Sequence, residues 1–178
     1  MWLRIQRIIA STSALTSFES DILDAHNQKR ALHGVPALKW NAKIAAYAAA
    51  YAAVALDCNN LQLVHSGGPY GENLAAGYVG GYSPVDAWYN EIKLYNYSQP
   101  GFSPATGHFT QVVWKSTTEL GCAMLLCNNA WRQYTICEYT NTRGNIVGTN
   151  PATGNNFFVD NVLPPLDGNY IHKRNVFT

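Results

Sequence analysis

The chain has 178 residues, of which 47% are hydrophobic and 12% aromatic, enough for one hydrophobic core and too few for two ordinary domains. Twelve basic and eleven acidic residues give a net charge of +1, and the basic residues are scattered, so we expect no nucleic-acid partner. No run is long and apolar enough to cross a membrane: the longest weakly polar run, residues 42–56, contains Lys43.

The N-terminal residues 1–19 are predicted to be a leader remnant or a tag-like segment. Two arginines precede an apolar run at residues 8–10, which is too short for a complete signal peptide. We therefore expect one domain over residues 20–166, followed by a C-terminal tail at residues 167–178.

The first helix is predicted to begin with Ser20 as its N-cap. Asp21 and Asp24 follow in the first turn, where carboxylates interact favourably with the helix dipole. Gly34 and Pro36 end this helix, because glycine suits the left-handed conformation after a last turn and proline cannot continue it.

Two further helices are predicted. Residues 42–56, capped by Asn41, carry hydrophobic residues at helical spacing, and their many alanines permit close packing. Residues 83–86, Ser-Pro-Val-Asp, open the third helix, with the serine as N-cap and proline at the first helical position. This helix places Trp88 and Glu91 on one broad face.

The second half of the chain is predicted to be mainly strands and loops. Residues 120–127 and 131–139 are rich in β-forming residues and are joined by a turn, which indicates an antiparallel hairpin. After residue 145 the composition favours loops, with one short strand at residues 157–159. Helices followed by a hairpin predict an α+β fold in which helices cover a small antiparallel sheet.

The four cysteines form an even set without zinc-finger spacing. Two disulfide bonds are the natural interpretation, and such bonds persist in oxidising compartments. The alternative is a set of four reduced cysteines in the core of a cytosolic protein. The cysteines are Cys58, Cys122, Cys127 and Cys137.

Four local patterns resemble those of a known family. Residues 26–30 match its H-N-x-x-R helix, residues 71–74 its G-E-N-[IL] segment, and residues 107–114 its G-H-[FY]-T-Q-[LV]-[LV]-W signature throughout. Residues 137–145 resemble its C-x-Y-x-P-x-G-N segment, but this segment is one residue longer and lacks the proline. The chain thus resembles the CAP family, which comprises cysteine-rich secretory proteins, antigen 5 and plant pathogenesis-related group-one proteins.

The resemblance covers about residues 20–166 and implies a three-layer α-β-α sandwich. It also implies secretion. For the cysteines it implies that Cys58 pairs with Cys127 and Cys122 with Cys137, one of the three connectivities that four cysteines allow.

The resemblance identifies His65, Glu72, Glu91 and His108 as the family's set of two histidines and two glutamates, from four segments that would converge in a cleft. Imidazole and carboxylate groups suit a divalent metal such as Zn²⁺, with open positions for water. The alternative is that these side chains hydrogen-bond one another and hold the cleft together without metal.

An enzyme is not predicted from these residues. The hydroxyls of Ser66, Ser103 and Thr106 lie near the set but in no nucleophile-elbow pattern, and no H-E-x-x-H helix is present. A metal-assisted hydrolase, with Glu72 or Glu91 as the base for a metal-bound water, is kept as an alternative.

The other histidines are predicted to have no chemical role. His26 and Arg30 lie one turn apart on the first helix and are interpreted as a structural pair. His33 and His172 have no recognisable partner and are expected on the surface or in loops.

Tyr95, Tyr97 and Phe102 lie in a loop that resembles the caveolin-type sterol-binding loop of the family's fungal and plant members. Three aromatic rings suit a rigid polycyclic ligand with one hydroxyl. The alternative is that these rings pack the loop onto the domain. Residues 96–98, Asn-Tyr-Ser, also form an N-glycosylation acceptor, whose glycan would crowd a sterol site.

The leading hypothesis is a secreted protein that binds or exports a sterol or a fatty acid, with the His/Glu set as a separate metal-capable site. One alternative is an extracellular interaction protein in defence or virulence that acts through its surface. The other is the metal-assisted hydrolase. The sequence leaves the ligand, the metal and the oligomeric state open.

Overall fold

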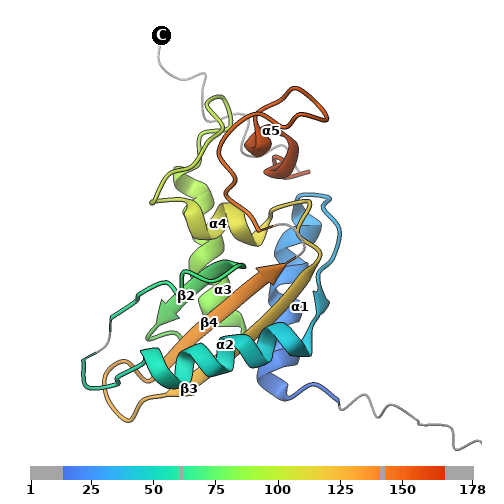
Figure 1. Ribbon diagram of the computed structural model, residues 1–178. Helices are drawn as coiled ribbons and strands as arrows, with labels where there is room; N and C mark the ends of the chain where they lie inside the picture. The colour runs from blue at the N-terminus through green and yellow to red at the C-terminus, as the bar shows by residue number, and fades with distance from the viewer. Residues whose placement is uncertain (1–13, 61, 141–142, 167–178) are drawn as a thin grey trace, which may run out of the picture.

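The computed structural model describes residues 14–60, 62–140 and 143–166 (Figure 1). Within these ranges no helix is long and apolar enough to span a membrane. The elements in chain order are α1 (Ser17–Leu32), β1 (Lys39–Trp40), α2 (Ala42–Ala55), β2 (Gly71–Ala76), α3 (Tyr82–Asn90), the 3₁₀ helix η1 (Glu91–Leu94), α4 (Gly107–Val112), β3 (Glu119–Leu126), β4 (Gln133–Thr140) and α5 (Phe157–Asn161).

The four strands form one sheet in the order β1-β3-β4-β2. β3 and β4 are the predicted antiparallel hairpin, with Cys122 opposite Cys137. β2, which was not predicted, pairs antiparallel with β4 and places Glu72 opposite Glu138. The short β1 pairs parallel with β3. Residues opposite each other in neighbouring strands share a face of the sheet.

Helix α2 covers one face of the sheet (Figure 1). It packs its small alanine side chains against Leu74, Tyr134 and Ile136. Gly121 permits this close approach, because a Cβ at that position would lie 2.2 Å from the backbone nitrogen of Ala45. The alanine-rich sequence of α2 is therefore a packing feature.

Helices α1 and α3 lie on the opposite face of the sheet (Figure 1). The larger hydrophobic core is on this side and includes Ile22, Trp88, Phe109, Trp114 and Tyr139. The predicted α+β class and three-layer α-β-α sandwich are confirmed.

Helix α1 begins earlier than predicted. Its N-cap is Thr16, whose hydroxyl accepts a hydrogen bond from Glu19 N at 3.3 Å, while the Glu19 carboxylate accepts one from Thr16 N at 2.8 Å. This reciprocal capping box starts the helix at Ser17, so the prediction that Ser20 is the N-cap is wrong. Helix α2 has the predicted cap, Asn41.

Helix α3 also begins earlier than predicted. It starts at Tyr82, after Gly81, and no side chain caps it, so the prediction that Ser83 is the N-cap is wrong. A Cβ on Gly81 would lie 2.5 Å from the backbone nitrogen of Ile22. The start of α3 is therefore set by close contact with α1.

Residues 157–159 lie in helix α5, so the predicted strand is wrong. Asn156 caps the helix by accepting a hydrogen bond from Phe158 N at 2.9 Å. The buried Phe158 ring meets Trp114 edge-on, with 5.0 Å between ring centroids. Two adjacent phenylalanines suit a strand as well as a helix, and here the asparagine cap decides in favour of the helix.

Both disulfide bonds implied by the family resemblance are confirmed, Cys58–Cys127 and Cys122–Cys137. The first ties the segment after α2 to the end of β3, and the second joins opposite residues of β3 and β4. No described cysteine is free. Each such bond typically contributes about 2 to 4 kcal/mol to stability, chiefly by constraining the unfolded chain.

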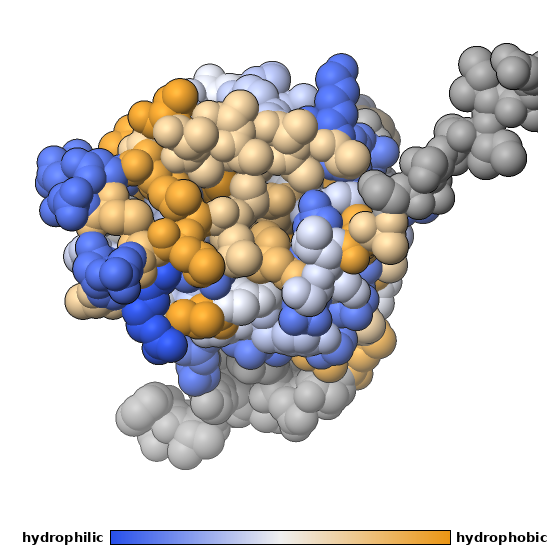
Figure 2. All heavy atoms as spheres, turned by 90° about the horizontal axis from the view of Figure 1, so that it is seen from below, coloured by the Kyte–Doolittle hydropathy of each residue, from blue (hydrophilic) through white to orange (hydrophobic). Residues whose placement is uncertain are grey.

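One end of the molecule carries an exposed hydrophobic area. Figure 2 views the end at which the labels of α2 and β3 lie in Figure 1, and shows hydrophobic residues in the middle of this face with hydrophilic residues at its sides. Exposed hydrophobic residues on α2, after it and on β3 include Val54, Leu63, Met124 and Leu126. A contact surface of this kind is what the surface-interaction hypothesis requires.

Candidate functional site

The first of two His–Glu pairs lies at the start of β2. His65 Nδ1 is 2.5 Å from Glu72 Oε1, and the backbone nitrogen of Ser66 donates to both oxygens of the same carboxylate, at 3.1 and 3.2 Å. The imidazole side chain is 63% exposed and the carboxylate side chain 6%. A buried carboxylate thus fixes the orientation of an exposed ring.

The second pair joins η1 to α4. His108 Nδ1 is 2.7 Å from Glu91 Oε1, and Glu91 Oε2 accepts hydrogen bonds from the backbone nitrogens of His108 at 3.0 Å and Phe109 at 3.1 Å. The His108 ring stacks on Trp88, with 6.2 Å between centroids. Glu91 therefore orients the imidazole and satisfies N–H groups at the start of α4.

Asn73 connects the two pairs. Its Nδ2 donates to the carbonyl oxygen of His108 at 3.1 Å and to the Tyr139 hydroxyl at 3.2 Å. Because Asn73 follows Glu72 in β2, the G-E-N segment supplies the carboxylate of the first pair and holds the backbone of the second.

The four side chains of the predicted metal set form two hydrogen-bonded pairs. The carboxylates are engaged by Nδ1 of His65 and of His108, and only the Nε2 atom of each ring has no partner among the described residues. Nor is any group of three or more His, Cys, Asp and Glu side chains in the described ranges arranged to hold a metal ion. These contacts are the mutual hydrogen bonds that were considered above as the alternative to a metal site.

A pocket of about 580 Å³ opens beside the first pair. Its wall combines His65 and Glu72 with Phe102, so part of the predicted metal set and one residue of the predicted sterol loop share a cavity. Glu91 and His108 do not line it. The wall also includes Tyr70, Gln111, Arg143, Gly144 and Val147.

The three aromatic residues of the predicted sterol loop are not equivalent. Tyr95 is buried, its ring lies 4.8 Å from that of Tyr97 and 5.5 Å from that of Phe109, and burial raises the pKa of Tyr95 to about 12. Tyr97 is half-buried and its hydroxyl donates to the Leu163 carbonyl at 3.5 Å. Phe102 is 52% exposed. Tyr95 and Tyr97 pack the loop onto the domain, and Phe102 remains available to a ligand.

The glycosylation acceptor lies apart from this pocket. Asn96 is exposed, and its Oδ1 accepts a hydrogen bond from the backbone nitrogen of Ser98 at 3.0 Å. Neither residue lines the pocket that contains Phe102. The predicted conflict between a glycan and the ligand site is therefore weaker than the sequence suggested.

A buried carboxyl lies opposite Glu72. Glu138 is fully buried, and its oxygens have no hydrogen-bond partner among the described residues. Burial and, secondarily, the Glu72 carboxylate raise the pKa of Glu138 to about 9. Glu138 is therefore protonated at neutral pH and adds no second negative charge beside Glu72.

Sequence reasoning did not single out Glu138, Gln111 or Arg143. Gln111 belongs to the matched signature at residues 107–114, and the other two belong to the segment at residues 137–145. These matched segments were the sequence feature that could have identified the three residues. Which of their atoms lack partners is visible only in the structure.

His26 belongs to the buried structural network that was predicted. Its Nδ1 faces the Ile22 carbonyl at 2.7 Å and must donate, so Nε2 accepts from the Tyr139 hydroxyl, also at 2.7 Å. Burial lowers the pKa of His26 to about 4. The ring is therefore neutral at physiological pH.

Arg30 is the other member of this network. Its guanidinium donates to four backbone carbonyls at distances of 2.7 to 3.0 Å, those of Pro36, Val112, Trp114 and Thr117. Burial lowers the pKa of Arg30 to about 10, which leaves it charged at neutral pH. The residue links α1 to the segment after α4, and the structural interpretation is supported.

The surface position predicted for His33 is wrong. The residue is buried at the C-cap of α1, where Nδ1 lies 2.6 Å from the Leu163 carbonyl and Nε2 lies 2.9 Å from the Tyr89 hydroxyl. Its partners come from distant parts of the sequence, so inspection of the chain could not find them. His172 lies outside the described residues.

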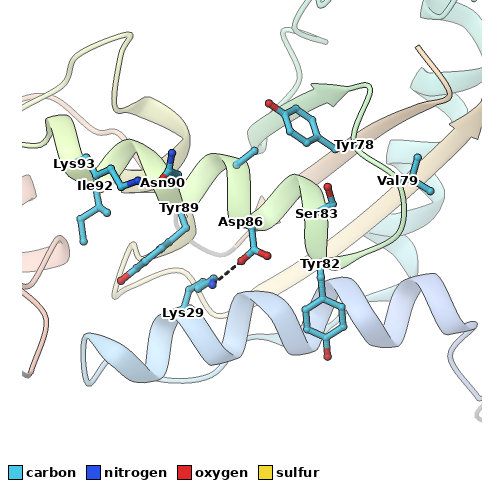
Figure 3. A pocket seen from close by; sticks show the side chains of 11 residues that line it. Lys29, Tyr78, Val79, Tyr82, Ser83, Asp86, Tyr89, Asn90, Ile92 and Lys93 are labelled. Carbon is cyan, nitrogen blue, oxygen red and sulfur yellow. Dashed lines mark ion pairs between the residues drawn. The ribbon is translucent and has the colours of Figure 1, made fainter. Parts of the chain in front are cut away.

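A larger pocket, of about 780 Å³, lies between α1 and α3 (Figure 3). Lys29 and Asp86 point toward each other across it, with 2.6 Å between Nζ and Oδ1, and Lys29 Nζ lies 5.2 Å from the centre of the Tyr89 ring. None of the predicted site residues lines this pocket. We place the candidate site in the smaller pocket because it is lined by a His–Glu pair, by an exposed aromatic ring and by Gln111, whose buried Nε2 has no partner among the described residues.

The chain matches a known family along most of its length. The family model described as "Cysteine-rich secretory protein family" matches residues 23–139. The chain is 59% identical over 157 residues to "Repressed by EFG1 protein 1" of Candida albicans, covering 88% of this chain and 58% of the relative. It is 49% identical over 155 residues to "Secreted protein RBT4" of the same organism, covering 84% and 42%. The chain thus spans about half the length of these relatives.

A solved structure shares the fold. "Crystal structure of NaASP2 with Zn2+" aligns with a TM-score of 0.58 at 18% identity, covering 83% of this chain and 88% of that one. At this identity the likeness shows the fold alone.

Proposed function

This chain belongs to the cysteine-rich secretory protein family, and from that premise we propose that it is an extracellular protein that binds a sterol or a fatty acid in the pocket beside His65. Two disulfide bonds support an oxidising compartment. A relative named as a secreted protein supports the same location.

The observation that carries this proposal is the amphipathic wall of the pocket. Phe102 and Val147 expose apolar surface beside the polar side chains of His65 and Arg143. A volume of about 580 Å³ is typical of pockets that bind small organic ligands. Such a wall matches a molecule with a hydrophobic body and one polar end.

The apolar contact differs from the one first expected. Tyr95 and Tyr97 pack inward, so the ligand surface is assigned to Phe102, with Tyr70 and Val147 completing it. Ligand contact therefore comes from three separate segments of the chain.

Phe102→Ala tests this assignment. Removing about 100 Å² of ligand contact would cost about 2 kcal/mol, so retention of labelled cholesterol should fall at least about tenfold. Leu94→Ala is the matched control, because Leu94 is also exposed but does not line the pocket. If the wild type retains no cholesterol or labelled fatty acid, the lipid proposal is wrong and the surface-interaction hypothesis is the better one.

The proposal is a binding function without catalysis. Ser66 Oγ accepts a hydrogen bond from Gly68 N at 3.2 Å, and no hydrogen bond links this hydroxyl to a histidine within the described part of the chain. The names of the relatives, such as "Secreted protein RBT4", also describe no reaction.

A second candidate function is metal binding by two histidines. Glu72 and Glu91 hold Nδ1 of His65 and His108, the arrangement by which carboxylates commonly orient metal-binding imidazoles. The Nε2 atoms would be the ligands, with water completing the coordination. The glutamates, first predicted as ligands, would act as orienting groups.

Calorimetry with Zn²⁺ tests this second candidate. His65→Ala/His108→Ala should abolish specific zinc uptake, and Glu72→Gln/Glu91→Gln should weaken it by about 10- to 100-fold, the usual effect of removing an orienting partner. Identical zinc uptake by the wild type and the histidine double variant would show that these residues form no metal site.

A further inference from the structure

The larger pocket, between α1 and α3, contains a stripe of polar side chains along one face of α3 and η1. These side chains recur at intervals of three or four residues, so they lie on successive turns of the same helical face. The residues of this stripe are Ser83, Asp86, Asn90 and Lys93. Apart from the ion pair of Asp86 with Lys29, none of the four side chains has a polar partner within the described ranges. Their hydrogen-bonding groups are therefore available to a ligand.

Two exposed tyrosine rings line the same pocket. Tyr78 lies in the loop after β2, and Tyr82 is the first residue of α3. Figure 3 shows the two rings on opposite sides of α3 in this view. They are 43% and 39% exposed, and neither stacks on another aromatic ring in the described part of the chain. Their faces therefore offer flat contact surfaces beside the polar stripe.

The charged groups of the pocket disfavour a purely apolar ligand. Lys29 and Asp86 form their ion pair within the pocket, and the Asp86 side chain is 57% exposed (Figure 3). An acyl chain would remove water from this pair and from the stripe without replacing the lost hydrogen bonds, which is costly. Because Asp86 neutralises Lys29, the wall does not require a charged ligand either. A ligand with many uncharged hydrogen-bonding groups fits it best.

A pyranose sugar meets both requirements of this wall. The hydroxyl groups at its rim can donate and accept hydrogen bonds, as the polar stripe requires. Its C–H groups carry partial positive charge, which suits the negative face of an aromatic ring. The volume of the pocket, about 780 Å³, is in the range of small-ligand sites.

We propose that the larger pocket binds a short oligosaccharide of uncharged hexopyranose units. The sugar rings stack on Tyr78 and Tyr82, and their hydroxyls hydrogen-bond to Asp86 and Asn90. This site goes beyond the proposed lipid-binding function and does not depend on it, because no residue lines both pockets.

Saturation-transfer-difference nuclear magnetic resonance with maltotriose, cellotriose and laminaritriose tests the proposal. The three probes consist of glucose units and differ in linkage, and the method detects millimolar binding. At least one of them should bind saturably. Tyr78→Ala/Tyr82→Ala should raise its dissociation constant at least about tenfold, because both stacking surfaces are lost. Trp131→Ala removes another ring, 47% exposed and outside the pocket, and should leave binding unchanged.

Asp86→Asn tests the polar stripe. It keeps the size of the side chain but replaces the carboxylate acceptor, so trisaccharide binding should weaken about three- to tenfold. Asp24→Asn makes the same change at an exposed position of α1 outside the pocket and should have no effect. Circular dichroism checks that each variant folds. If the tyrosine double variant does not fold, the Asp86→Asn variant still decides the proposal.

Sorbitol tests the contribution of the rings. It carries a row of hydroxyl groups but has no preformed C–H face, so it should not displace the bound trisaccharide at equal concentration. Displacement by sorbitol would show that hydroxyl groups alone are recognised, and would overturn the stacking assignment.

Three further outcomes would overturn the proposal. The first is that none of the trisaccharides binds saturably. The second is binding that persists unchanged in the folded tyrosine double variant and in Asp86→Asn, which would place the sugar elsewhere. The third is displacement of the trisaccharide by dodecanoate, which would show that this pocket takes a lipid. Failure of the wild type to retain cholesterol or a fatty acid would contradict only the lipid proposal, because the two pockets share no residue.

Discussion

Two adjacent residues of β4 are both buried, but only one of them has hydrogen-bond partners. The hydroxyl of Tyr139, on the α1 side of the sheet, donates to His26 Nε2 and accepts a hydrogen bond from Asn73. The carboxyl of Glu138 faces the other side, with Glu72, and has no partner among the described residues. The same contrast separates Arg30, which donates to five carbonyls, from Gln111, whose Nε2 donates to none in the described part of the chain.

The two kinds of buried polar group differ in their contribution to stability. Complete pairing of a buried network fixes one arrangement of the core, whereas an unpaired buried group costs stability that the rest of the fold must offset. Such groups are expected where a ligand completes them. In this molecule two of the unpaired groups among the described residues, Gln111 Nε2 and the Glu138 carboxyl, lie at or beside the pocket with His65 and Phe102. The others, on Tyr95, Trp114 and Tyr134, lie in the core away from it.

The largest effect is expected from Arg30→Met. This change removes one donor from each of five backbone carbonyls, so the free energy of unfolding should fall by about 4 kcal/mol or more. Urea unfolding under non-reducing conditions measures it. The control is Lys29→Met, which breaks only a partly exposed ion pair with Asp86 and should cost less than about 1 kcal/mol. Similar losses in both variants would contradict a structural role for the network.

Acid should destabilise the protein through His26. The pKa of about 4 in the folded state lies below the ordinary value of 6.5, so protons bind the unfolded chain more readily. This contribution to stability is complete above about pH 6.5 and should be lost progressively toward pH 4, by about 3 kcal/mol. His26→Leu should flatten that part of the stability curve, measured by urea unfolding at a series of pH values. His65→Asn, which changes an exposed histidine, should keep the loss of stability between pH 6.5 and pH 4. If stability depends equally on pH in the two variants, His26 is not responsible for that loss.

A smaller effect of opposite sign is expected from Glu138. Its pKa of about 9 lies above the ordinary value of 4.5, so its contribution to stability is complete below about pH 4.5 and is lost as the pH rises toward 9. Glu138→Gln keeps the shape without the titration and should raise the free energy of unfolding by about 2 kcal/mol at pH 6. A variant less stable than wild type at pH 6 would mean that Glu138 is paired and belongs with the structural network.

Much of the fold followed from local sequence signals. Asn41 marked the start of α2, the turn between residues 127 and 131 marked the hairpin, and the family motifs implied both disulfide bonds. Errors arose where contact with another element decided the outcome. Gly81 starts α3 because α1 lies against it, and His33 is buried by Leu163 and Tyr89, which are far away in the sequence.

The sequence predicted which residues form the candidate site, but it did not predict how their side chains contact one another. The motifs supplied His65, Glu72, Glu91 and His108, yet nothing in the spacing showed that each glutamate would hold Nδ1 of one histidine. The aromatic pattern supplied Phe102 together with two tyrosines that face the core. Gln111 was visible only as part of a motif, because an unpaired Nε2 is a property of the folded surroundings.

Nuclear magnetic resonance can show whether a ligand contacts the unpaired Gln111 amide and leaves the paired network unchanged. A ¹H–¹⁵N correlation experiment during titration with dodecanoate follows the Gln111 side-chain amide and Arg30 Nε in the same sample. The Gln111 Nε2 protons should shift and become protected from exchange with solvent as the ligand saturates, while the Arg30 signal stays in place. A saturable titration that leaves the Gln111 amide unchanged would show that the ligand does not use this donor.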